Sequence, residues 1–80
     1  MTPTDAILAD LDADGVLTGL PADDAELLVA ALSYDVCLRS DPARSMRSRA
    51  AAVRAGRWPC EDRSGVAQAL DAAAALLDVL

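Results

Sequence analysis

The chain has 80 residues, a net charge of −6, and neither His nor Lys. A chain of this length forms one small domain, so residues 1–80 are expected to fold as a single unit. The missing His excludes Ser-His triads and His-ligated zinc, and two Cys cannot complete a structural zinc site. No glycine-rich phosphate motif and no apolar run of membrane-spanning length occur. We expect no enzyme activity, no cofactor and no membrane span.

The first predicted helix spans residues 3–13. Thr2 suits the N-cap position, Pro3 suits the first helical position, and Gly15 ends the helix. Apolar residues on one side of this helix would face a core.

A second helix is predicted from just after Pro21 to residue 38 or 39. Its apolar side chains spread over most of the circumference, which is typical of a central helix with neighbours on more than one face. Asp35 is the exception in this run, and a buried carboxylate must be paired. We expect its partner to be an Arg, with Arg39 and Arg47 as the candidates.

The third predicted helix spans residues 42–55, between the N-cap Asp41 and Gly56. A narrow stripe of small apolar residues would face the core. The opposite side is basic, and the candidate interaction residues there and just beyond are Arg44, Arg47, Arg54 and Arg57. Such a face could contact nucleic acid or an acidic partner. It could equally be solvated or paired within the chain.

The fourth predicted helix begins between residues 60 and 64 and runs to the end of the chain. Its apolar stripe continues to the last residue, whereas frayed termini are usually polar. We expect this stripe to dock onto the rest of the bundle or onto another copy. The candidate apolar interface residues are Trp58, Val66, Leu70, Leu77 and Leu80. Trp58 has an alternative role as a packing plug between the third and fourth helices.

The segment from Asp10 to Thr18 resembles part of an EF-hand calcium loop. Asp10, Asp12 and Asp14 occupy alternate positions before the turning Gly15, which would supply hard oxygen ligands. The twelfth position, which should be a bidentate Glu, is Pro21. The alternative is a plain helix end, whose acids would need a nearby Arg because the helix dipole disfavours them there.

Two Cys residues complete the candidate sites. Cys37 lies in an apolar run and is expected to be an inert core residue. Cys60 precedes a helix, which lowers a thiol pKa, but Glu61 and Asp62 act in the opposite direction. If the second and fourth helices were antiparallel, Cys37 and Cys60 would approach each other and could form a redox pair.

Charge is distributed unevenly along the chain. Residues 1–35 hold eight acids and no base, whereas residues 36–65 hold seven Arg and three acids. This pattern favours attraction within one chain or between copies over general nucleic-acid binding. Because bulky apolar residues are few, a lone copy would be marginally stable, which favours a homodimer.

The sequence as a whole predicts an all-α bundle of four short helices, completed by homodimerisation. We expect a small, acidic, non-enzymatic protein that acts by binding other proteins, as an accessory, adaptor or regulatory and inhibitory subunit. A transcription-linked regulator using the Arg-rich segment 42–57 and a calcium-responsive protein are the alternatives. The N-terminus lacks a basic signal-peptide region, so we expect a cytoplasmic protein. The Ala, Asp and Arg bias with no Lys or Asn favours a GC-rich bacterial source.

Overall fold

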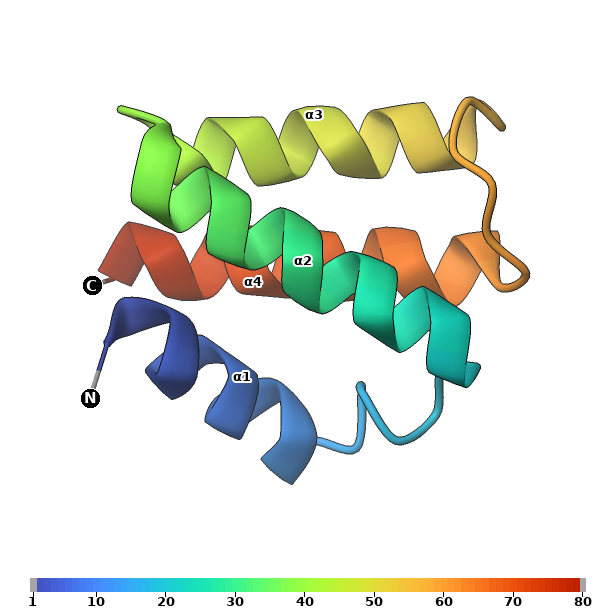
Figure 1. Ribbon diagram of the computed structural model, residues 1–80, viewed down its shortest axis with the longest axis horizontal. Helices are drawn as coiled ribbons and strands as arrows, with labels where there is room; N and C mark the ends of the chain where they lie inside the picture. The colour runs from blue at the N-terminus through green and yellow to red at the C-terminus, as the bar shows by residue number, and fades with distance from the viewer. Residues whose placement is uncertain (1, 80) are drawn as a thin grey trace.

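The computed structural model describes residues 2–79, and the all-helical expectation is confirmed for them. This part of the chain contains four helices and no strand (Figure 1). The helices are α1 (Pro3–Ala13), α2 (Ala22–Leu38), α3 (Pro42–Arg54) and α4 (Arg63–Val79). They pack into a compact globule with a Cα radius of gyration of 11.3 Å.

The helix ends follow the capping residues of the sequence. The Thr2 hydroxyl accepts a hydrogen bond from the Asp5 amide at 3.2 Å, and the Asp41 carboxylate accepts one from the Arg44 amide at 3.1 Å. Pro residues stand in the first turns of α1 and α3, where a missing N–H costs nothing. Gly15 and Gly56 take positive φ angles of 76° and 77° just after α1 and α3, a conformation that favours Gly. These local signals fix where the helices begin and end.

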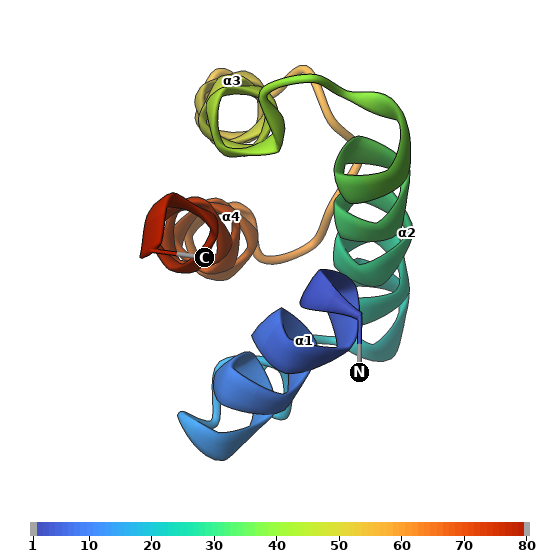
Figure 2. The same ribbon diagram turned by 90° about the vertical axis from the view of Figure 1, so that its left-hand side faces the viewer.

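The closest pair of helices is α3 and α4, which lie side by side and antiparallel (Figures 1 and 2). Both helices carry small buried side chains, among them Ala50 on α3 and Ala73 on α4. Small side chains let the two backbones approach closely, as the narrow stripe predicted for residues 42–55 implies. Helix α4 also contacts α1 and α2, so its apolar stripe is covered within the chain.

Helix α2 packs against all three other helices but is not buried on every side. Its buried residues follow one stripe: Asp24, Leu28, Ala31, Leu32 and Asp35. The flank beside this stripe carries Tyr34, 49% exposed, and Leu38, 67% exposed. The expected neighbours on more than one face are therefore present, but the expected central position is wrong, because α2 lies at the edge of the bundle (Figure 2).

The loop between α3 and α4 is held in place by Asp24 from the start of α2. The buried Asp24 carboxylate accepts hydrogen bonds from the Glu61 amide at 3.1 Å and the Asp62 amide at 2.8 Å. A Cβ on Gly65 would lie only 2.9 Å from the Leu20 side chain, so α4 also lies tightly against the loop between α1 and α2. These contacts fix the path of the loop that carries Trp58.

Candidate functional site

A buried ion pair links α2 to α3. Asp35 is fully buried, and Arg49 donates two hydrogen bonds to its carboxylate, from Nε at 2.6 Å and from Nη2 at 2.7 Å. Arg39 lies farther away, with its Nε 3.9 Å from the Asp35 Oδ1. The hydrogen bonding that Arg49 donates to the Asp35 carboxylate is the main cause that raises the pKa of Arg49, which stays charged.

The expected Arg partner of Asp35 is thus present, but its identity differs from the prediction. Arg39 is the weaker of the two partners, and Arg47 is wrong because it pairs with Asp78. Arg49 was not among the candidates. It lies on the side of α3 that turns toward α2, and this orientation depends on how the two helices cross.

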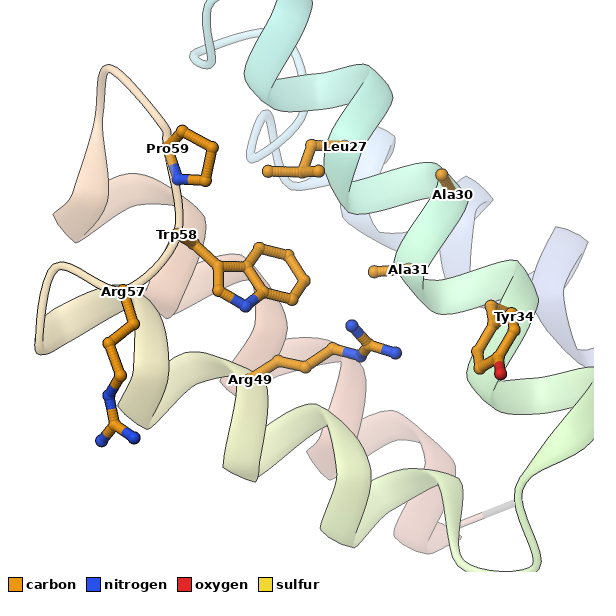
Figure 3. A pocket seen from close by; sticks show the side chains of 8 residues that line it. All are labelled: Leu27, Ala30, Ala31, Tyr34, Arg49, Arg57, Trp58 and Pro59. Atoms are coloured by element: carbon orange, nitrogen blue, oxygen red, sulfur yellow. The ribbon is translucent and has the colours of Figure 1, made fainter.

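The Arg49 guanidinium is also enclosed by aromatic rings. Its Cζ atom lies 5.2 Å from the Trp58 ring centroid and 5.9 Å from the Tyr34 ring centroid, within the range of cation–π attraction. Arg39 lies over Tyr34 at 5.5 Å. Figure 3 shows the Trp58 ring and the Arg49 guanidinium both directed toward α2. The ion pair therefore places the Arg49 guanidinium against both aromatic side chains.

These residues border an open pocket of about 560 Å³ between α2, α3 and the loop before α4 (Figure 3). Its lining is mainly apolar: Leu27, Ala30, Ala31, Tyr34, Arg49, Arg57, Trp58 and Pro59. Leu38 lies on the same side of α2, farther along the helix, and is mostly exposed. We name the surface formed by Leu27, Ala30, Tyr34, Leu38, Trp58 and Pro59 the α2–Trp58 face.

Trp58 belongs to this face and not to the α3–α4 contact. Its side chain is half-buried and packs against the core from the α2 side. Trp58 therefore packs against the core, as the packing-plug interpretation predicted. It does so on the α2 side and not between α3 and α4. The sequence alone did not single out Leu27, Ala30 and Tyr34. Their spacing along one flank of α2 was visible, but nothing local showed which flank the bundle would leave open.

The candidate basic residues do not form one free stripe. Arg47 pairs with Asp78, and Arg54 donates to Asp71 at 2.6 Å. These two exposed pairs link α3 to α4 but add little to stability, because solvent screens the charges. Arg44 is exposed near the start of α3, and Arg57 lies at the rim of the pocket. Internal pairing therefore neutralises half of the predicted Arg face.

The predicted apolar interface of the fourth helix lies largely inside the chain. Val66 and Leu70 are fully buried in the core, and Leu77 is half-buried against it. Leu80 lies outside the described residues. Of the four predicted interface residues that the structure describes, Trp58 is the one that borders the open pocket.

The acidic residues that resemble an EF-hand loop are not brought together. Asp10, Asp12 and Asp14 are all exposed, and residues 2–79 hold no group of three His, Cys, Asp or Glu side chains placed to bind a metal ion. Gly15 acts as the end of α1. The Arg expected beside these acids is not found either, because the ion pairs of the described residues use other carboxylates.

The two Cys residues are free and lie far apart. The Asp24 hydrogen bonds place the beginning of α2, and not its end, beside the beginning of α4. At 1.5 Å per residue, Cys37 lies about 20 Å farther along α2. Cys37 is exposed, contrary to the prediction of a core residue. Burial, followed by the nearby Asp24 carboxylate, raises the pKa of Cys60, which disfavours a reactive thiolate.

Comparison with known proteins gives no relative: no family model, no curated protein and no solved structure matches the chain. Within residues 2–79, no helix is both long enough and apolar enough to cross a membrane. The chemistry of the α2–Trp58 face is therefore the basis for proposing a function.

Proposed function

We propose that this protein is a non-enzymatic protein-interaction module that binds the apolar side of a helix at its α2–Trp58 face. The observation that carries the proposal is the open apolar pocket, bordered by Trp58 and by a half-exposed Tyr34. An elongated apolar surface beside a helix suits a second helix, which buries its own apolar side there. A role as an accessory, adaptor or regulatory subunit follows from such binding.

The aromatic residues of this face are suited to binding because they are already positioned. Trp, Tyr and Arg are the residue types enriched at the energetic centres of protein interfaces. Arg49, held by Asp35, contacts both rings, so little side-chain freedom remains to be lost when a partner docks. Loss of side-chain freedom costs about 0.5–1.5 kcal/mol for each flexible side chain that binding immobilises. A pre-ordered Tyr34 and Trp58 avoid part of this cost.

The surface charge favours a protein partner over nucleic acid. Nucleic-acid binding needs a continuous set of free basic residues along the phosphate backbone. Here Arg47 and Arg54 already pair with carboxylates of α4, and the whole chain carries a net charge of −6. Arg57 at the rim of the pocket is better suited to an acidic group at the edge of a protein partner.

A matched pair of exposed Ala substitutions tests the proposal. Ala30 borders the pocket on α2, whereas Ala75 is exposed on α4 away from it. We expect Ala30→Glu to abolish capture of a specific partner by the tagged protein in its native host, because the new carboxylate would enter the apolar pocket. Ala75→Glu adds the same charge and helix-forming residue elsewhere, and should leave capture unchanged.

The partner should then be identified by mass spectrometry and its affinity measured with purified components. Circular dichroism should show equal helix content for the two variants, since Glu is a good helix former at exposed positions. Capture that Ala30→Glu leaves intact would contradict binding at the α2–Trp58 face.

A further inference from the structure

We infer that the occupant of the α2–Trp58 face is a second copy of this chain, whose α2 lies antiparallel against the first. This inference rests on the proposed function and adds the identity of the partner and the alignment of the two helices. It also moves the predicted dimer contact from α4 to α2. Side chains and charges follow a self-complementary order along the exposed flank of α2.

The exposed flank of α2 can pair with itself when one copy is reversed. Asp23, Leu27, Ala30, Tyr34 and Leu38 follow one another at intervals of three or four residues, which places them on one side of the helix. Consider a two-fold axis that passes between Ala30 and Ala31 and relates the two copies of α2. It sets Leu27 of each copy opposite the partner's Tyr34. Small Ala residues then meet at the centre, where they permit close approach of the backbones. An arrangement in which each contact occurs twice is the rule for two-fold dimers.

The charges along α2 also favour the reversed arrangement. The exposed acids Asp23 and Glu26 stand in its first turns, and the base Arg39 follows its last turn. The acid near the end of α2, Asp35, is buried and already paired with Arg49. An antiparallel pair of helices places Asp23 beside the partner's Arg39 at each end. A parallel pair would place acid beside acid.

Trp58 lies where it would extend this contact beyond the two helices. The Trp58 ring lies beside α2 in the region of Leu27 and Ala31 (Figure 3). In a two-fold dimer, the partner's α2 would cover the exposed part of this ring. The local attraction between acids and Arg residues would also offset the repulsion between two chains that each carry −6.

A charge exchange between two variants tests the reversed alignment. Asp23→Arg places Arg beside the partner's Arg39, and Arg39→Asp places Asp beside the partner's Asp23. We expect each variant alone to dimerise at least about tenfold more weakly than the unmodified chain, since two contacts become repulsive. An equimolar mixture should recover dimers, because each mixed dimer restores both attractive contacts. Sedimentation velocity measures the association, and native mass spectrometry distinguishes mixed from identical pairs.

Asp12→Arg on α1 makes the same change of charge at an exposed position away from the face, and serves as the control. It should dimerise like the unmodified chain. Circular dichroism on each variant separates a loss of association from a loss of fold, which matters for Arg39 because it also lies near Asp35.

The outcomes distinguish this inference from the proposed function. A monomeric unmodified chain at high micromolar concentration, or a mixture that recovers no dimer, would overturn the antiparallel α2 dimer. If the chain is monomeric but host capture still depends on Ala30, the α2–Trp58 face binds a different protein and the proposed function stands. If the chain is monomeric and Ala30→Glu leaves host capture unchanged, both proposals fail.

Discussion

Arg49→Met is expected to lower the free energy of unfolding by about 3–5 kcal/mol, because it leaves the carboxylate of Asp35 buried without its main partner. Asp35 is fully buried, whereas 22% of the Arg49 side chain is exposed. Met keeps an unbranched apolar chain between Tyr34 and Trp58, so the measured loss reports mainly the unpaired charge. Urea unfolding followed by circular dichroism gives the free energy directly.

Replacing the acidic partner, in Asp35→Leu, should lower the free energy of unfolding by less than Arg49→Met does. In Asp35→Leu the free guanidinium can turn toward water, because Arg49 lies at the edge of the pocket. The double variant Asp35→Leu/Arg49→Met should regain most of the free energy of unfolding that Arg49→Met loses, since it leaves no unpaired charge. Equal stability of Arg49→Met and the unmodified protein would show that the pair is not buried as described.

Leu70→Ala is expected to lower the free energy of unfolding by about 2–5 kcal/mol through the lost burial and the cavity left behind. Leu70 is fully buried in α4 within one chain. The loss should therefore persist at protein concentrations too low for association, and urea unfolding at two concentrations separates the two cases. An 80-residue domain has only about 4–12 kcal/mol of total stability, so the variant would be partly unfolded or close to it.

Val79→Ala on the same helix provides the control for Leu70→Ala. Val79 is exposed, and its truncation should change stability by less than about 0.5 kcal/mol. If Leu70→Ala weakened association but left the unfolding of the single chain unchanged, Leu70 would be an interface residue, as the sequence first predicted, and not a core residue.

The helices of this protein could be predicted from sequence because their ends are set by local chemistry. Thr2, Asp41 and the two Gly residues at positive φ each act within one turn of a helix end. The narrow stripe of α3 likewise predicted close contact with a neighbour. Such features depend on residues near one another in the chain, so the sequence pattern predicts them.

The site was harder to predict because it depends on how helices that are separated along the chain cross in space. The apolar flanks of α2 look alike in sequence, and only packing against α3 and α4 shows that the flank with Tyr34 is left open. For the same reason, Arg49 was not predicted as the partner of Asp35, and Cys37 was wrongly predicted to lie in the core. The α4 stripe was correctly predicted to be covered, but its cover comes from α1, α2 and α3 of the same chain.

The most direct test of an antiparallel contact through α2 is disulfide cross-linking of Ala30→Cys, with Cys37 and Cys60 both replaced by Ser. Position 30 lies next to the proposed two-fold axis, where a disulfide can form because it needs Cα atoms within about 7 Å. Ala22→Cys on the same helix and Ala75→Cys on α4 are matched exposed controls. In this alignment the two copies of position 22 lie about 25 Å apart. We expect mild oxidation to give a covalent dimer for Ala30→Cys and single chains for both controls. Single chains for Ala30→Cys, or equal cross-linking of all three variants, would contradict the account.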